Sequence, residues 1–377
     1  MLNKKLGQVF TPENIVEQML NLRKNVGSIL EPSCGDGIFL NKIKDCVGIE
    51  YDSNICPKNA INLDFFDYSL TNTFDTIIGN PPYIKYTNIC DDTKIKLDIS
   101  LFDKRSNLYL FFIEKSIKHL NKNGELIFIV PRDFIKSTSS KKLNKFIYKN
   151  GTITDLVDLG DQKIFKNATP NTIIFRFEKD NFSRITNNYL NFIYDSGQLY
   201  FLKNKMNKIK FSDLFFVKVG AVSGCDELFK HSDGIEFVCS YTAKTTKTKS
   251  MLYNKYHEDL LQYKNKLIKR KIKKFNENNW YMWGRDYYKS MQPRIYVNVK
   301  TRIKKPFFIH DAKSYDGTIL AIFPKHEKVG KILSQVCDLF NEIDWGEMGF
   351  MCGNRYIFSQ QSLENCILPD VFEKFVL

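Results

Sequence analysis

The sequence predicts an α/β fold, with a parallel sheet in the first half of the chain and a second domain after it. Short apolar, β-branched runs alternate with helical stretches over the first half, which is typical of a parallel sheet covered by helices. From about Phe182 this alternation fades, and lysine-rich, aromatic and turn-rich segments take its place. Since 377 residues exceed one minimal domain, we expect one domain at 1–185 and a second, mixed α/β domain at 186–377.

The elements of the first domain are expected in a regular order. Strands are predicted where β-branched and aromatic residues cluster between turn signals: Ser28–Leu30, Val47–Glu50, Thr76–Gly79, Leu126–Val130, Ile153–Leu159 and Thr172–Phe177. The clearest helix is predicted at Asn107–Leu120, because its apolar residues recur with the helical period. Another helix is predicted to begin at Ile38.

Composition restricts the class of protein. The net charge of +14 makes a polyanionic partner or an acidic membrane surface worth considering. The nine cysteines form no C-x-x-C pair and the five histidines no ligand spacing, which argues against a disulfide framework and a zinc site. No apolar leader or run of membrane-spanning length is found. We expect a cytoplasmic protein with no metal and no membrane segment.

The first candidate site comes directly after the first predicted strand. Gly35 and Gly37 let the backbone pass close under a ligand at the carboxyl end of that strand. Their spacing is not the dinucleotide G-x-G-x-x-G, and the nearby Glu31 suits an ammonium group better than a pyrophosphate. Such a turn is often only a loop, so its interpretation depends on the residues further along the chain.

Two acidic residues further along the chain occupy positions that suit contacts with a nucleoside. Glu50 ends the second predicted strand, where a carboxylate can accept hydrogen bonds from both ribose hydroxyls. Asp64 precedes Phe65 and offers an acceptor for an adenine amino group beside an aromatic ring. An acidic residue after a strand is usually solvated surface, but the order and spacing of these features favour a nucleoside site.

The candidate catalytic motif is Asn80-Pro81-Pro82-Tyr83, directly after a strand. The prolines fix φ and remove two N–H donors, so local carbonyls can face outward. The Asn80 side-chain oxygen and the Pro81 carbonyl can then accept both hydrogens of an exocyclic amine, and Tyr83 can stack on the base. The alternative is a proline-stiffened turn. Because the motif follows Glu31, Glu50 and Asp64 in the sequence, the catalytic interpretation is favoured.

These motifs together resemble the TaqI-like (gamma) class of N6-adenine DNA methyltransferases, in which the cofactor motif precedes the catalytic motif. The resemblance implies a Rossmann-like sheet that binds S-adenosylmethionine, without a metal, and methylates a flipped-out adenine within a restriction-modification system. It implies cofactor contacts from Thr11, Glu31, Ser33, Cys34, Gly35, Gly37, Glu50, Tyr51, Asp64, Phe65, Asn80 and Phe112.

The resemblance also implies roles for single residues. Thr11 would lie near the methionine carboxylate, and Phe112 would close the far side of the cofactor adenine. Tyr83 and Phe165 would stack on the target base. Tyr51 departs from the family, which commonly has an aliphatic residue there. For Phe112 and Phe165 the alternative is an ordinary packing role in the core or at the sheet.

The second half carries the predicted DNA contacts. Six of the nine residues from Lys266 to Lys274 are Lys or Arg, and aromatic residues come after them, a mixture that suits phosphate and base contacts. A solvated helix face is the alternative. Val217–Gly224 resembles the opening of target-recognition domains in the family. The predicted DNA-binding residues are Lys269, Arg270, Lys271, Arg285 and Arg294.

Double-stranded DNA is therefore the expected partner, bound by a monomer, and a separately encoded restriction endonuclease is a plausible genetic partner. Two alternatives stay open. A protein-glutamine or RNA methyltransferase would use the same motif, although nearly half the chain lies beyond the sheet, which favours DNA. A non-catalytic DNA specificity subunit is disfavoured by the intact Asn80, Tyr83, Glu50 and Asp64.

Overall fold

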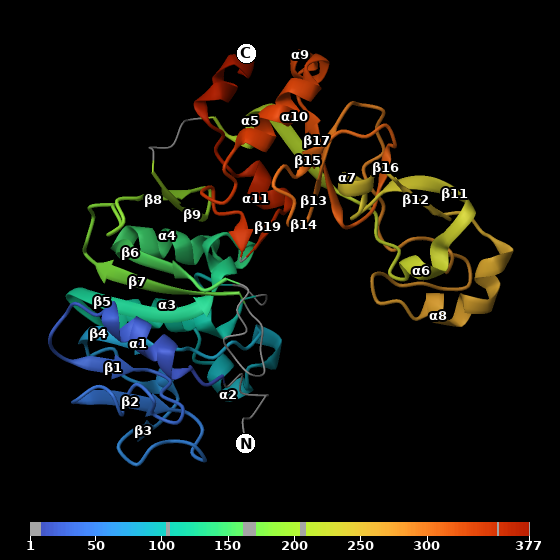
Figure 1. Cartoon of the computed structure of the whole chain (residues 1–377). Helices are drawn as coiled ribbons and strands as arrows, with labels where there is room; N and C mark the ends of the chain where they lie inside the picture. Colours follow the sequence, from blue (N-terminus) through green and yellow to red (C-terminus); the bar gives the residue numbers. More distant parts are fainter. Residues whose placement is uncertain (1–8, 103–105, 161–170, 204–208, 353, 377) are drawn as a thin grey trace. The chain divides into compact units, whose positions relative to one another are not determined.

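The computed structural model describes residues 9–102, 106–160, 171–203, 209–352 and 354–376. These residues form two compact units, one within Met1–Lys205 and Glu347–Asn354 and the other within Met206–Gly346 and Arg355–Leu377 (Figure 1). Across the described ranges, no helix combines the length and apolarity needed to cross a bilayer.

The first unit is built on a sheet that contains seven strands among the described residues, in the order β3-β2-β1-β4-β5-β7-β6. The strands are β1 Ile29–Glu31, β2 Cys46–Glu50, β3 Ile61–Asn62, β4 Phe74–Gly79, β5 Leu120–Pro131, β6 Gly151–Asp158 and β7 Thr172–Lys179. β3, β2, β1, β4 and β5 pair in parallel, whereas β7 lies between β5 and β6 and runs antiparallel to both. The expectation of a parallel sheet is therefore wrong for β7, because an apolar run does not encode strand direction.

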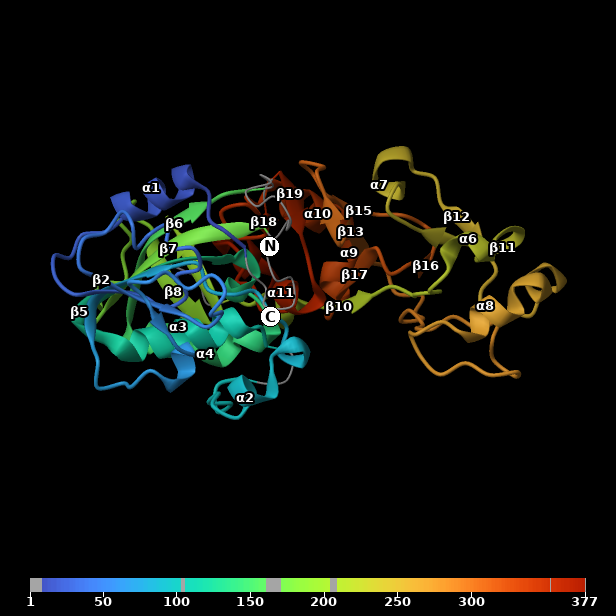
Figure 2. The same cartoon turned by 90° about the horizontal axis from the view of Figure 1, so that it is seen from below.

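Helices cover both faces of this sheet (Figure 2). α1 (Glu13–Asn21) lies on one face, and α3 (Leu108–His119) and α4 (Lys141–Asn150) lie on the other. Side chains of β5 alternate between the two cores: Phe128 packs with α3 and α4, and Ile127 and Ile129 pack with α1. Since both faces are buried, the strands contain nearly continuous apolar runs.

The helix predicted from Ile38 is not present. Residues 35–42 form consecutive turns instead, with hydrogen bonds such as Gly37 N–H to the Cys34 carbonyl, 2.8 Å. The Asn41 and Ile43 N–H groups each donate to the carbonyl four residues back, whereas the Lys42 N–H between them donates only three residues back, to Phe39, so successive helical hydrogen bonds are not formed. The helix predicted at Asn107–Leu120 is found as α3, and the Asn107 side chain accepts the Tyr109 N–H.

The first unit continues beyond the expected boundary at residue 185. Its last two strands, β8 (Asn191–Asp195) and β9 (Gln198–Leu202), form a hairpin that packs on α4 and β6. A later segment, Glu347–Asn354, also belongs to this unit and contains β18 (Met351–Cys352). The Lys136 ammonium donates to the Met348 carbonyl there, 2.6 Å. The short helix α2 (Asp91–Lys94) also belongs to this unit.

The second unit contains small sheets and short helices, in agreement with the predicted mixed composition. One sheet has the order β10-β17-β13-β15, another β12-β11-β16, and β14 pairs with β19. The strands are β10 Phe215–Val219, β11 Lys230–Val238, β12 Lys249–Met251, β13 Ile295–Asn298, β14 Lys300–Thr301, β15 Phe307–Phe308, β16 Ser314–Tyr315, β17 Ile319–Pro324 and β19 Arg355–Ile357. The helices are α5 Phe211–Leu214, α6 Asp226–Phe229, α7 Thr242–Thr245, α8 Lys264–Ile268, α9 Glu327–Lys331, α10 Leu333–Glu342 and α11 Gln360–Glu364.

Candidate active site

A cavity of about 320 Å³ lies within the first unit, where β1, β2 and β4 end at one edge of the sheet. Parallel strands present their carboxyl ends at the same edge, and open α/β sheets bind ligands there. The predicted residues that line it are Ser33, Gly35, Glu50, Tyr51, Asp64, Phe65, Asn80, Pro81, Pro82 and Phe112. The structure thus brings together residues that lie far apart in the sequence.

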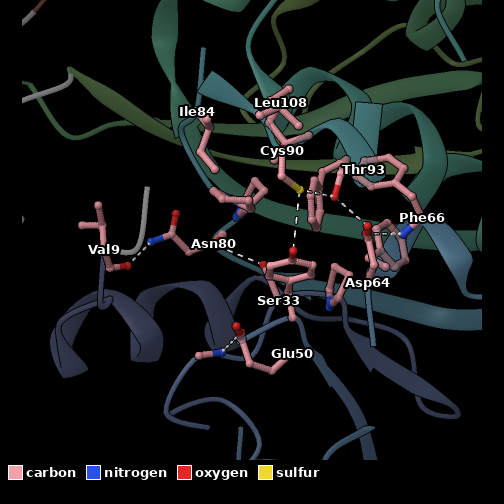
Figure 3. Close-up of a pocket in the computed structure, with 18 of the residues that line it drawn as sticks. Val9, Ser33, Glu50, Asp64, Phe66, Asn80, Ile84, Cys90, Thr93 and Leu108 are labelled. Carbon is pink, nitrogen blue, oxygen red and sulfur yellow. Dashed lines mark hydrogen bonds between the residues drawn. The ribbon is translucent and has the colours of Figure 1, made fainter. Parts of the chain in front are cut away.

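Glu50 ties the glycine turn to the end of β2. One carboxylate oxygen accepts the Gly35 N–H at 2.8 Å (Figure 3). The other accepts the Asp52 N–H at 2.9 Å. Burial raises the pKa of the Glu50 carboxyl. Each carboxylate oxygen keeps a second lone pair, so Glu50 can still accept hydrogen bonds from a ligand in the cavity.

Glu31 is a buried acid that lacks a full set of partners. It is 2% exposed at the end of β1, and its Oε2 has no hydrogen-bond partner among the described residues. Burial raises the pKa of its carboxyl well above the ordinary value. A buried acceptor left unpaired is costly. A cationic ligand group that reached this oxygen would give it a partner and would lower the pKa of the carboxyl.

The Asn80 side chain is held in one orientation. Its Nδ2 donates to the Val9 carbonyl at 3.0 Å and to Thr11 Oγ1 at 3.1 Å, as Figure 3 shows for Val9. Its Oδ1 is buried and has no partner in the described part of the chain. The Ser33 hydroxyl fixes the adjoining backbone by donating to the Asn80 carbonyl, 3.1 Å. The amide therefore offers a free, oriented acceptor beside the cavity.

Tyr83 lies away from the cavity wall. It is not among the lining residues; its hydroxyl donates to the Ile129 carbonyl at 2.9 Å, and its ring meets Tyr109 edge to face, with centroids 5.9 Å apart. The ring is half-buried. The predicted stacking of this ring on a target base remains a prediction.

Asp64 and three phenylalanines form the far end of the cavity. Phe65 and Phe112 are stacked with centroids 5.1 Å apart, and Phe66 meets Phe112 edge to face. Asp64 Oδ1 accepts the Phe66 N–H at 3.0 Å, and Oδ2 accepts the Thr93 hydroxyl at 2.7 Å (Figure 3). This end offers flat apolar surface beside a carboxylate, which suits an aromatic heterocycle that carries an amino group.

The segment that covers this end is not predicted from the sequence. The cavity is also lined by Asn88, Ile89, Cys90 and Thr93, which come after the catalytic motif. Cys90 Sγ lies 3.6 Å from the Tyr51 hydroxyl and 3.2 Å from Thr93 Oγ1. No local motif marks these residues, because their role depends on where the chain returns. Phe10 also lines the cavity and could have been found, since it adjoins Thr11.

The other predicted cofactor residues, Glu31 among them, are not among the residues that line the cavity. Thr11 is buried and acts on the site through Asn80. Cys34 is buried toward Gly48, and Gly37 packs against Pro57; neither lines the cavity. Phe165 falls outside the described residues, so its predicted stacking role is not placed.

Two predicted DNA-binding arginines lie in the core of the second unit. Arg270 is 8% exposed and donates to the carbonyls of Leu267, Ser223, Trp280 and Met282. Arg294 is 2% exposed. It donates to the carbonyls of Gln292, Lys313 and Ser290. These contacts hold the fold together, and neither guanidinium is exposed for the predicted DNA contact.

The other three predicted DNA contacts are exposed: Lys269, Lys271 and Arg285. Arg285 also donates to the Gly220 carbonyl at 3.1 Å, which orients its guanidinium. Lys273 and Lys274 are exposed as well. The basic segment therefore separates into a buried arginine and exposed lysines that are available to a polyanion.

Comparison with known proteins identifies similar chains. Residues 36–165 match the model of the family described as Eco57I restriction-modification methylase. Type II methyltransferase M.HincII of Haemophilus influenzae is 34% identical over 187 residues, which cover 46% of this chain and 37% of that protein. Type II restriction enzyme and methyltransferase RM.Eco57I of Escherichia coli is 38% identical over 143 residues, 35% of this chain and 14% of that protein. The expected resemblance to restriction-modification methyltransferases is confirmed over this part.

The matched segment spans less than half the length of the first curated relatives; for M.TthHB8I of Thermus thermophilus, 30% identical over 198 residues, the shares are 47% of this chain and 46% of that protein. Among solved structures, the type IIL restriction-modification enzyme MmeI in complex with DNA has a TM-score of 0.60 at 12% identity, covering 93% of this chain and 64% of that one. This likeness concerns the fold, and with the strand order it confirms the predicted Rossmann-like sheet with a second α/β unit.

Proposed function

We propose that this protein is a site-specific DNA adenine-N6 methyltransferase that uses S-adenosylmethionine, the modification enzyme of a restriction-modification system. The observation that supports this most strongly is the fixed amide of Asn80, whose donors are bound to Val9 and Thr11 and whose oxygen is buried and unpaired within the described residues. An unpaired buried acceptor next to a ligand cavity suits a donor that arrives with the substrate. An exocyclic amine is such a donor.

The residues that line the cavity, together with Glu31, which adjoins the lining residue Pro32, fit S-adenosylmethionine. The unpaired Glu31 oxygen suits the ammonium of the methionine group, Glu50 the ribose hydroxyls, and Asp64 with Phe65 and Phe112 the adenine. Bound there, S-adenosylmethionine would supply an electrophilic methyl group on a sulfonium. None of these contacts calls for a metal ion.

The chemistry assigned to the chain's own residues is positioning. Asn80 Oδ1 and the Pro81 carbonyl would accept the two hydrogens of the target amine, turning the nitrogen lone pair out of conjugation. No strong general base is needed, because the amine becomes acidic only after it is methylated. Positioning and preorganised acceptors can supply several kcal/mol of the barrier. The Pro82–Tyr83 pair would support the face of the base.

Double-stranded DNA is the proposed substrate. A base in a duplex cannot reach a cavity of this kind, so it must be extruded at a cost of about a few kcal/mol. The net charge of +14 and the exposed lysines after α8 suit phosphate contacts. The relatives' names point the same way, since several are type II methyltransferases. We further propose a monomer on DNA, in the cytoplasm, with a separately encoded endonuclease as genetic partner.

Transfer of a radioactive methyl group tests this proposal. The purified full chain is incubated with methyl-tritiated S-adenosylmethionine in three separate reactions, which contain duplex DNA, RNA or protein from the host. We expect label in DNA and in N6-methyladenine after nucleoside digestion. Label in N4-methylcytosine would correct the acceptor atom. Label in RNA or protein, or no label with active cofactor binding, would overturn the proposed substrate or the enzymatic role.

A further inference from the structure

Two His-x-Asp tripeptides of the second unit lie side by side, although they are separated along the sequence. They are His231-Ser232-Asp233, on β11, and His257-Glu258-Asp259, which forms the start of a 3₁₀ turn capped by His257 and spanning Glu258–Tyr263. The two imidazole rings have centroids 4.3 Å apart. We propose that His231, His257 and Asp233 form a binding site for a divalent transition metal ion such as Zn²⁺.

The candidate ligand atoms converge on one side of the two rings. Asp233 Oδ2 lies 3.9 Å from His231 Nδ1 and 3.9 Å from His257 Nε2, and ligand atoms of these three residues lie within 4.8 Å of one another. Ligands at about 2.0–2.1 Å from a tetrahedral zinc ion stand about 3.3 Å apart. The three atoms therefore need only small movements to hold an ion.

Asp259 supports both histidines from the opposite side. Its Oδ2 lies 3.0 Å from His231 Nε2 and 3.6 Å from His257 Nδ1. A carboxylate that accepts the second ring N–H fixes the tautomer and raises the basicity of a metal-bound histidine. His231 Nδ1 is the unprotonated ring nitrogen, since it accepts the Asp233 N–H at 3.0 Å. Its single lone pair must leave that N–H to bind an ion. His257 Nδ1 accepts the Asp259 N–H at 3.3 Å. Binding an ion through Nε2 would move the ring proton to Nδ1 and exchange this bond for one to the Asp259 carboxylate, 3.6 Å away.

The position in the fold explains why these residues meet. β11 pairs with β12, and the register shifts between Lys230 and Ile235, both of which lie opposite Met251. Residues 231–234 therefore leave the ladder as a bulge, and bulges redirect side chains. His231 and Asp233 are carried on this bulge, and His257 caps the 3₁₀ turn. An ion would tie the bulge to the turn.

The donor set selects the class of ion. Two imidazoles and one carboxylate suit zinc, cobalt or nickel, whereas Mg²⁺ and Ca²⁺ prefer all-oxygen sites. The histidine side chains are about a quarter exposed and Asp233 is 72% exposed, so water can complete the coordination sphere. The site lies in the second unit and the methyl-transfer cavity in the first. The ion would therefore stabilise the fold and take no part in methyl transfer, in contrast to the expected absence of a metal.

Metal titration of the full-length protein tests the site. The chain is freed of metal with a chelator and titrated with Co²⁺ and with Zn²⁺, followed by the visible spectrum of cobalt and by calorimetry. We expect one bound equivalent whose cobalt spectrum shows nitrogen and oxygen ligands and lacks a thiolate charge-transfer band. The absence of a thiolate band shows that the ion is not bound by the cysteines. The Zn²⁺-loaded protein is expected to unfold at a higher temperature than the metal-free protein.

Variants identify the ligands. His231→Gln and His257→Gln are each expected to abolish this equivalent, and Asp259→Asn to weaken affinity roughly 10–100-fold. His326→Gln, at the start of α9, is the matched control and should bind like the wild type. Circular dichroism and S-adenosylmethionine binding by the first unit check that each variant is folded. Absence of the bound equivalent in the wild type, its persistence in both histidine variants, or a thiolate spectrum would overturn the proposal.

Discussion

Asn80 combines two properties that are rarely found in one side chain of a folded protein. Both hydrogens of its amide are bound to partners from the N-terminal segment, while its oxygen has none within the described residues. The first property removes the freedom of the amide to rotate, and the second leaves an acceptor whose desolvation cost is already met in the folded state. A site preorganised in this way stabilises a donor without reorganisation during the reaction.

Replacing Asn80 with alanine is expected to lower the rate of methyl transfer by about 10²–10³-fold or more, since one preorganised acceptor is removed. Cofactor affinity should change little, because Glu31, Glu50 and Asp64 are untouched. Single-turnover transfer and calorimetric binding measure the two quantities. Thr11→Val, which removes one anchor of the amide, should give a smaller loss of rate, and Thr11→Ser should restore it. Normal turnover by the alanine variant would refute the catalytic assignment.

Glu31 should make cofactor binding depend on pH. Burial raises the pKa of its carboxyl well above the ordinary value, so the protonated, neutral form persists at pH values where most carboxyls are charged. Only the ionised form attracts an ammonium group. Affinity for S-adenosylmethionine should therefore rise as the pH increases through this raised pKa.

Calorimetric titration at a series of pH values measures this rise. Glu31→Gln should weaken binding and remove the part of the pH dependence that comes from Glu31. Adenosine, which lacks the amino-acid group, is the control ligand, and any dependence it retains belongs to Glu50, whose pKa burial also raises. An unchanged profile in the Gln variant would show that Glu31 does not face the ammonium.

Strands and helices are predicted best from the sequence where an apolar run is buried on both faces of the sheet. Val130 and Ile129 pack into opposite cores, so β5 contains a continuous apolar run, and α3 has a clear helical period. The prediction fails after Ile38, where the apolar residues suit a helix but the backbone hydrogen bonds alternate between four-residue and three-residue spacing. The prediction of a parallel strand also fails for β7, because strand direction depends on which strands pair, and the apolar sequence of β7 does not determine this.

The pairing of β5 with β7 contains a buried ion pair that should be important for stability. Arg176 Nε lies 2.6 Å from Glu125 Oε2, and the two side chains are 2% and 0% exposed. Glu125 also accepts the Thr76 hydroxyl. Removing one partner leaves the other charge buried and uncompensated, which costs about 3–5 kcal/mol.

Arg176→Met is accordingly expected to destabilise the first unit by about 3–5 kcal/mol, measured as a lower denaturation midpoint in urea with S-adenosylmethionine absent. Lys42→Met is the matched control, because the Lys42–Glu13 pair is 30% and 69% exposed and exposed pairs contribute about 1 kcal/mol or less. Equal midpoints for the two variants would show that the buried pair carries no special weight.

The cavity is assembled from segments that lie far apart in the sequence. Glu31, Glu50 and Asn80 could be predicted because each lies at the end of a strand at the same edge of the sheet. Cys90 and Thr93 could not, since they reach the cavity only through the path of the chain after the catalytic motif. The basic run after α8 shows a related limit: charge is visible in the sequence, but burial is not, and Arg270 differs from its neighbours only in the folded protein.

That difference yields a prediction for DNA binding. Lys269 and Lys271 are exposed, so the double variant Lys269→Ala/Lys271→Ala should weaken binding and reduce the slope of log affinity against log salt by about 0.9 for each phosphate that the protein no longer neutralises. Arg270→Ala should instead lower the thermal stability of the second unit, because four backbone carbonyls lose their donor.

Fluorescence anisotropy with a duplex at several salt concentrations, together with thermal unfolding, separates the two effects. Lys328→Ala/Lys331→Ala removes the same charge from exposed positions on α9 and serves as the control for a general electrostatic effect. If the salt slope fell equally in both double variants, net charge alone would account for it, and the segment after α8 would lose its assignment. A larger reduction for Lys269 and Lys271 places the phosphate contacts on that segment, because counterion release counts only those charges that meet a phosphate.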